Sequence, residues 1–288
     1  MRFSLLLVAC LAIAEEIIIR PQWKAGDKFE FEHLQTHEEV RRPQSKITSS
    51  TPLFLEVADT SAQGHTVRWR YGKTKLPVER EAPPALAKAE EMLLDLAIEA
   101  RLGPSGEFLK VANEAAVAGK LNEVLKAVAA TLPPDAAEIP LLKQMLNPQM
   151  LLASATGDMR AFFAPYGVKL REGEKTRVTV IQPFPLQPGR SLTVQLYFGI
   201  SGTNEEKTEF QSVAEYDIQQ LGDRVMEWLT TNGMRVQDRS LMPQLFLSET
   251  GEFRFDKVRG LLSRAVVTRR STMEPGYDRL ERREFVLR

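Results

Sequence analysis

The sequence is poor in the residues that build metal sites, disulfide frameworks and membrane spans. Its 288 residues contain one cysteine, Cys10, and three histidines. A single cysteine excludes an intramolecular disulfide, and no apolar run reaches the ~20 residues of a spanning helix. On one strand, His33 and His37 would stand about 13 Å apart, too far to share a metal ion. We expect no metal site and no cofactor, with these histidines and His65 at the surface or at strand ends.

An excess of charge of either sign is also absent. Thirty-eight Lys and Arg residues balance thirty-eight Asp and Glu residues, so the formal net charge is zero. A chain without a basic surplus is a poor partner for a phosphate backbone, and we expect no nucleic-acid partner. Residues 254–288 are locally basic, with ten Lys or Arg against five acids. We interpret that segment as the solvated face of strands.

Motifs that specify an enzyme mechanism are missing as well. Ser105 lies in Gly103-Pro104-Ser105-Gly106, which is typical of a hairpin turn rather than of a nucleophile elbow. Paired carboxylates such as Glu90-Glu91 are adjacent, so on a strand they point to opposite faces. No glycine-rich loop leads into a helix to hold a phosphate. We expect a protein that is not an enzyme, with an unrecognised hydrolase as an alternative.

Residues 1–14 have the layout of a secretory signal peptide. One basic residue precedes an apolar run, and a small-x-small triplet ends at Ala14. Cleavage after Ala14 would release residues 15–288 as an exported, periplasmic or secreted protein without cysteine. Two alternatives stay open. Leu7-Val8-Ala9-Cys10 loosely fits a lipobox, which would make Cys10 the site of a membrane anchor, or the run is a first strand that continues through residues 15–19.

Alternation of apolar and polar residues predicts strands on both sides of a central block. In residues 15–112, apolar side chains alternate from 94 to 102, for example, and turn-forming residues separate such segments. Residues 164–288 repeat the pattern and predict a second antiparallel meander. Thr250-Gly251-Glu252-Phe253 also matches Ser105-Gly106-Glu107-Phe108, and we expect a hairpin turn at each, because glycine accepts the positive φ of a turn.

The apolar period becomes helical in residues 113–163. Asn113 would cap a first helix, and a second helical piece would run from Pro140 through Leu146. Asn147 followed by Pro148 would begin a third piece, with a further short turn through Phe163. Residues 223–231 also read as a helix, although the Asn-Gly pair that follows is equally a hairpin signal. The apolar residues of the first helix fall on one face: Val117, Leu121, Val124, Leu125 and Val128.

The helical block offers candidate binding residues, a set of methionines and large apolar side chains. Flexible, polarizable methionine suits a surface that adapts to varied apolar ligands. A core under a curved sheet needs the same residue types, and core packing is their commoner role. Both roles stay open. The candidates for lining an apolar ligand are Met145, Leu146, Met150, Leu151, Met159, Phe162 and Phe163.

Three turn motifs give the chain a resemblance to an uncharacterised family of exported bacterial proteins. They are Gly26-Asp27-Lys28-Phe29, Gly106-Glu107-Phe108 and a late hairpin from Gly251 to Gly260. More distantly, the chain is similar to periplasmic lipoprotein carriers, which are half-barrels with helices on the concave side of a curved sheet. The resemblance implies that an apolar ligand or an acyl chain binds in the concavity. It carries over no ligand-contacting position.

These observations predict an α+β fold, a curved, half-barrel-like antiparallel sheet with a central helical block. The two meanders are either related β halves or parts of one long sheet. We expect an exported envelope protein that binds an apolar small molecule or lipid. The alternative is a scaffold whose helices fill the concavity and whose strand edges bind an envelope protein partner. A cavity of at least ~300 Å³ would favour ligand binding.

Overall fold

The computed structural model describes residues 16–77, 84–133, 136, 139–140, 143, 146–184, 187, 190–231, 233, 245–273 and 277–288. The expected signal peptide, with Cys10 and Ala14, lies outside these residues, and so does the candidate Met145. Cleavage and lipidation therefore stay predictions. Within the described part of the chain, every helix is too short or too polar to cross a membrane.

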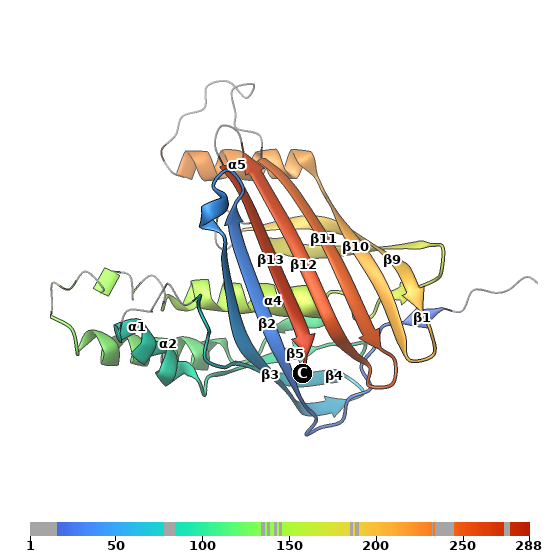
Figure 1. Ribbon diagram of the computed structural model, residues 1–288, viewed down its shortest axis with the longest axis horizontal. Coiled ribbons are helices and arrows are strands. Elements are labelled where there is room, and N and C mark those ends of the chain that lie inside the picture. Colours follow the sequence, from blue (N-terminus) through green and yellow to red (C-terminus); the bar gives the residue numbers. More distant parts are fainter. Residues whose placement is uncertain are drawn as a thin grey trace, which may run out of the picture.

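The described residues form one curved, unclosed sheet of 11 antiparallel strands with helices packed against it (Figure 1). The α+β fold predicted from the sequence is confirmed. The strand order in the sheet is β6-β5-β4-β3-β2-β13-β12-β11-β10-β9-β8. The strands are β2 (Lys28–Glu39), β3 (Ile47–Ser61), β4 (Gly64–Tyr71), β5 (Ala97–Leu102), β6 (Phe108–Val111), β8 (Lys175–Pro183), β9 (Ser191–Thr203), β10 (Lys207–Tyr216), β11 (Leu245–Asp256), β12 (Leu261–Met273) and β13 (Tyr277–Leu287).

The two predicted meanders join in the middle of this sheet. The first long strand, β2, pairs with the last, β13, and His33 lies opposite Phe285. The two edges, β6 and β8, therefore come from the middle of the chain, on either side of the helical block. Of the two arrangements that the sequence left open, the meanders form one long sheet. A small separate pair joins β1 (Ile17–Ile18) to β7 (Lys169–Leu170).

The helices follow the apolar periodicity. α2 (Glu114–Ala129) buries four of the five residues predicted for its inner face, and α4 (Pro148–Phe163) is one continuous helix. Asn147 caps α4 as expected, because its side-chain oxygen accepts hydrogen bonds from the next two free N–H groups. α1 (Pro84–Leu93) precedes β5, and a 3-10 turn, η1 (Pro43–Ser45), connects β2 to β3.

α5 (Ile218–Thr231) lies at the far end of the sheet from α1 and α2 (Figure 1). It confirms the helix among the two options for the segment before residue 232. Its buried residues are Leu221, Val225 and Leu229, which recur at helical spacing and cover the end of the sheet.

Asn113 occupies the N-cap position of α2 as expected, but it lacks the capping hydrogen bond, and the expected start of the strand at Leu94 was wrong. The side chain of Asn113 makes no hydrogen bond to α2. Its Oδ1 instead accepts from the N–H of Glu99 at 2.8 Å and its Nδ2 donates to the carbonyl of Ala97 at 2.9 Å, which fastens the start of α2 to β5. The strand begins only at Ala97, because the chain first makes a tight turn out of α1.

The hairpin expected at residues 250–253 was also wrong. Gly251 lies in mid-strand in β11, opposite Ser212 on one side and Val267 on the other. A Cβ on Gly251 would stand 2.4 Å from the Phe253 ring and 2.4 Å from Ser212 Oγ. The glycine is therefore needed for a close approach of side chains. The true turn lies between β11 and β12, where Gly260 adopts a φ of 59°.

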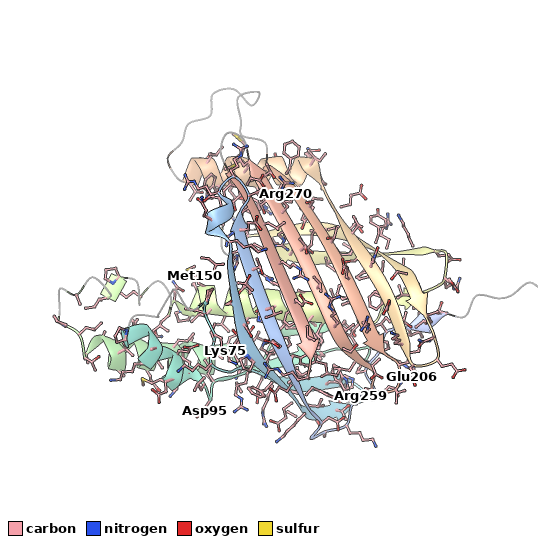
Figure 2. The ribbon with its side chains drawn as sticks, viewed as in Figure 1. Lys75, Asp95, Met150, Glu206, Arg259 and Arg270 are labelled. Carbon is pink, nitrogen blue, oxygen red and sulfur yellow. The ribbon has the colours of Figure 1, made fainter. Side chains whose placement is uncertain are left out.

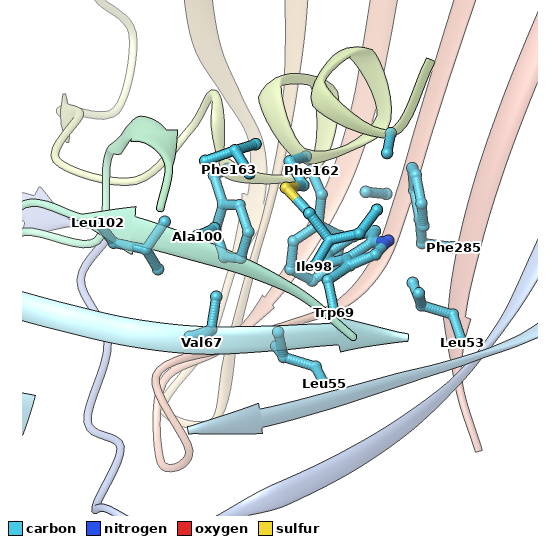
Figure 3. Close-up of a cluster of buried hydrophobic side chains, with 14 of the residues drawn as sticks. Leu53, Leu55, Val67, Trp69, Ile98, Ala100, Leu102, Phe162, Phe163 and Phe285 are labelled. Atoms are coloured by element: carbon cyan, nitrogen blue, oxygen red, sulfur yellow. The ribbon is translucent and has the colours of Figure 1, made fainter. Parts of the chain in front are cut away.

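A cluster of aromatic rings holds α4 against the sheet (Figure 3). The Phe162 ring of α4 is fully buried, and its centroid lies 5.0–5.7 Å from four others. Three of the contacts are edge-on or nearly so to rings of the sheet, a favourable arrangement for aromatic pairs. The four partners are Phe31, Trp69, Phe163 and Phe285.

Candidate functional site

α4 has two faces with different roles. One face packs on the sheet through Asp158, Met159 and Phe162, all buried. The other face carries small residues at helical spacing, and these small side chains leave room between the helix and the strands. The small residues on this second face are Ala153, Gly157 and Ala161, with Met150 and Arg160 beside them and the C-cap residue Ala164 after them.

That room is a partly open cavity of about 700 Å³, which we call the α4 cavity. Its wall comes from α4, from the edge strands β6 and β8, and from the concave side of β9 to β13. Most of the wall is apolar, with Phe163, Leu196 and Phe253 among its large side chains. The volume lies within the 300–1,000 Å³ that is usual for small-molecule sites.

Three apolar side chains at the rim of the α4 cavity are exposed to solvent. Leu109 of β6 is 57% exposed, Met150 of α4 is 47% exposed and Ile181 of β8 is 60% exposed. Met150 lies at the N-terminal end of α4 (Figure 2). Exposed apolar side chains that group around an opening are typical of a site that binds an apolar partner.

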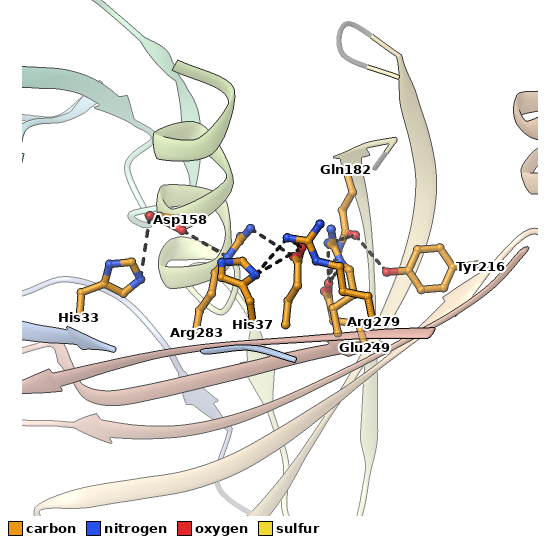
Figure 4. A network of polar contacts seen from close by, with 10 residues as sticks. His33, His37, Asp158, Gln182, Tyr216, Glu249, Arg279 and Arg283 are labelled. Carbon is orange, nitrogen blue, oxygen red and sulfur yellow. Dashed lines mark hydrogen bonds and ion pairs between the residues drawn. The ribbon is translucent and has the colours of Figure 1, made fainter. Parts of the chain in front are cut away.

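A polar cluster contributes Gln182, Glu249 and Arg269 to the wall of the cavity (Figure 4). Arg269 donates from Nε to Glu249 Oε2 at 2.7 Å and from Nη2 to Gln182 Oε1 at 2.7 Å. Gln182 in turn donates to Glu249 at 2.8 Å and accepts from the Tyr216 hydroxyl at 3.1 Å. Burial opposes the charge of Arg269, but the Glu249 carboxylate outweighs it and raises the pKa of Arg269. Burial also raises the pKa of Tyr216.

A second cluster connects the cavity to the core through Arg283. Its Nε lies 3.4 Å from Asp158 Oδ1, and Asp158 Oδ2 accepts from the Tyr71 hydroxyl at 2.7 Å. On its other side, Arg283 lies 3.9 Å from a carboxylate oxygen of Glu281. Burial raises the pKa of Tyr71 well above its ordinary value. Gly157 of α4 faces the guanidinium, and a Cβ on this glycine would lie only 3.3 Å from Nη1 of Arg283. The arginine is therefore packed closely between helix and strand.

Two of the three histidines are buried. His33 is buried, stacked on Phe285 with ring centroids 4.6 Å apart, and its Nε2 lies 4.0 Å from Asp158. Burial lowers its pKa, so the neutral ring is favoured. His65 is buried as well, with Nδ1 2.7 Å from Thr60 Oγ1. The expected position was wrong for His33, whose ring lies in mid-strand between Tyr71 and Phe285. His65 lies at the start of β4, as the strand-end alternative expected, although its ring is buried against Trp23.

His37 is partly exposed between Arg279 and Glu281. Its Nδ1 lies 3.1 Å from Arg279 Nη2 and 3.8 Å from Glu281 Oε1. Within the described ranges, no group of three or more His, Cys, Asp or Glu side chains could hold a metal ion.

The candidate binding residues separate between the two faces of α4 and its surroundings. Met150 and Phe163 line the α4 cavity. Leu146, Met159 and Phe162 are buried in the hydrophobic core, and Leu151 packs against the core while partly buried. Residue type alone could not separate the faces, because both carry apolar residues.

The arginines of the cavity wall were not identified from the sequence, and the interpretation of the basic segment 254–288 was incomplete. The basic segment 254–288 was interpreted as a solvated strand face, yet Arg269 and Arg283 lie on the cavity side of the sheet. Strand alternation could have placed these two arginines on the inner face of the sheet. Arg269 shares its strand face with Ala265 and Val267, and Arg283 shares its face with Phe285.

Comparisons with known proteins add little. No protein-family model and no curated protein matches the chain. A solved structure described as "lipid-protein interactions in lipovitellin" is similar, with a TM-score of 0.48 and 6% sequence identity. The match covers 91% of this chain and 25% of that chain, so this chain spans about a quarter of its length.

Proposed function

We propose that the protein binds an apolar or lipid-like ligand in the α4 cavity and is not an enzyme. The observation that carries the proposal is the cavity of about 700 Å³ between α4 and the edge strands. Its wall combines large apolar side chains with a few convergent polar groups, the usual make-up of a ligand site. Burying an apolar chain there would remove the chain from water and place it against the apolar wall.

The scaffold alternative requires a concavity that its helices fill. α4 meets the sheet closely on its Phe162 face, but the small side chains of Ala153, Gly157 and Ala161 leave space between its other face and the strands. Space of this size next to the core favours ligand binding over a filled interior. The hydrolase alternative needs a histidine beside a serine and a carboxylate in a cleft. His33 has Asp158 beside it, but neither side chain lines the cavity.

The proposal includes an exported location, periplasmic or secreted. Arg2, the apolar run and Ala14 support it, and so does the resemblance to exported bacterial proteins and to half-barrel carriers. Cys10 offers the other form, a membrane-anchored lipoprotein. In either form, the curved sheet would hold its ligand away from the water of the compartment.

Filling the α4 cavity should abolish ligand binding without unfolding the protein. In the variant Ala161→Phe, a ring would project from the small-residue face of α4 into the space the ligand needs. With the neutral apolar probe N-phenyl-1-naphthylamine, whose fluorescence rises on leaving water, we expect the Kd to increase about tenfold or more, a loss of ~1.4 kcal/mol.

The matched control is Ser154→Phe, which places the same ring on the same helix at an exposed position outside the cavity lining. It should leave the probe affinity of the wild type unchanged. Equal affinity in the wild type and in Ala161→Phe, with both proteins folded by circular dichroism, would show that the probe binds elsewhere and refute the proposed site.

A further inference from the structure

Arg160 stands at the opening of the α4 cavity and contacts both edges of the sheet. Its Nη1 donates to the carbonyl oxygen of Ile181, on edge strand β8, at 2.6 Å. Its guanidinium carbon lies 5.8 Å from the centroid of the Phe108 ring, on edge strand β6. The side chain therefore spans the opening, close to the exposed apolar rim formed by Leu109 and Ile181.

Arg160 differs from the other two arginines of the cavity wall, each of which has a carboxylate partner. Arg269 has Glu249, and Arg283 has Asp158 and Glu281. Among the described residues, Arg160 has no carboxylate within ion-pair distance. Glu107, the remaining carboxylate of the cavity wall, instead accepts a hydrogen bond from its own turn, at the N–H of Ser105.

The surroundings of Arg160 are suited to an anion. Partial burial lowers the pKa of Arg160, because the charged form has lost part of its water shell. A guanidinium carries five N–H donors in a planar fork, and the hydrogen bond to Ile181 uses one nitrogen only. A carboxylate or phosphate matches that fork with two parallel hydrogen bonds, whereas a neutral hydroxyl does not.

The wall beyond Arg160 is suited to a hydrocarbon chain. Ala161 and Ala164 follow it along the cavity face of α4, and Phe163, Tyr166 and Phe253 form large apolar surfaces deeper in. A ligand with an anionic end and one apolar chain could therefore bind Arg160 at the opening and the apolar side chains of the interior at the same time.

We propose that the cavity takes a single-chain anionic amphiphile of the fatty-acid type, with its charged end at Arg160 and its chain along the small-residue face of α4. The inference rests on the proposed function, since it names the ligand class of the same cavity. It makes Arg160 the residue that selects charged over neutral chains.

The test compares decanoate with decanol, which have the same chain and different ends. Both are titrated at pH 7.5 against bound N-phenyl-1-naphthylamine, and the Kd of each is obtained from displacement. We expect the wild type to bind decanoate about 10–100-fold more tightly than decanol, as a charge-assisted hydrogen-bonded pair provides. Arg160→Gln should lose most of that preference and leave the Kd of decanol within about threefold.

Two further variants control for net charge and geometry. Arg177→Gln removes an exposed arginine of β8 outside the cavity lining and should keep the preference for decanoate. Arg160→Lys keeps the charge without the fork and should fall in between.

The outcomes separate the two proposals. If both probes bind with equal affinity and Arg160→Gln changes neither Kd, the role of Arg160 is refuted while the apolar cavity stands. If the naphthylamine, decanoate and decanol all fail to bind the folded wild type, ligand binding itself is refuted, and the anionic preference with it.

Discussion

Replacing Phe162 with alanine should lower the free energy of unfolding by about 3–5 kcal/mol, the usual cost of emptying a buried phenylalanine site. The ring is fully buried and contacts four other aromatic rings, three of them on the sheet. A cavity in this place cannot collapse easily, because Phe31 and Phe285 are fixed by strand pairing and only α4 could move inward. Urea unfolding followed by tryptophan fluorescence measures the change, since Trp69 lies in the cluster.

The control for Phe162→Ala lies on the same helix. Met150→Ala removes a side chain that is 47% exposed at the rim of the cavity, so its effect on stability should stay within about 0.5 kcal/mol. A cost below ~1 kcal/mol for Phe162→Ala would mean that α4 is not held by the aromatic cluster, and the division of the helix into a packed and an open face would fail.

The second large effect is expected at the buried ion pair of the polar wall. Arg269→Met should cost about 3–5 kcal/mol, because it leaves Glu249 without its counter-ion in a largely buried position. The side chains of Arg269 and Glu249 are only 19% and 10% exposed. Gln182 would lose the same donor, which weakens the connection between β8 and the centre of the sheet. The measurement is again the free energy of unfolding in urea.

Two comparisons identify the cause of that loss. The double variant Arg269→Met with Glu249→Leu should recover most of the stability, since an apolar pair replaces a buried ion pair at little cost. Arg254→Met breaks an exposed pair with Glu209 on neighbouring strands and should cost less than about 1 kcal/mol. Equal losses for Arg254→Met and Arg269→Met would contradict the buried character of the pair.

The elements of this fold follow from local patterns, and that part of the architecture could be predicted. Alternation specified the strands, apolar spacing specified α2, and Asn147 with Pro148 specified where α4 begins, although not its full length to Phe163. The errors arose where a residue has a tertiary role that mimics a local one. Gly251 was assigned to a turn because glycine is common there, whereas its lack of a side chain makes room for Phe253 and Ser212.

The site itself was largely beyond local prediction. Arg160 is one of many arginines in the sequence. Its place at the opening depends on the tertiary fold, which brings α4 into contact with both edge strands, β6 and β8. Arg269 and Gln182 are 87 positions apart, so no short motif could join them. The candidate methionines showed which segment mattered. They could not show which face of α4 was open, because the small residues that keep it open carry no chemistry of their own.

The central claim is that the α4 cavity holds a ligand, and native mass spectrometry of the protein purified from the cells that produce it tests this most directly. The account predicts that the wild type carries a non-covalent mass of lipid or fatty-acid size that is lost on denaturation. Ala161→Phe, purified in the same way, should appear as the bare polypeptide. A bare polypeptide for the folded wild type as well would contradict the account and favour a scaffold.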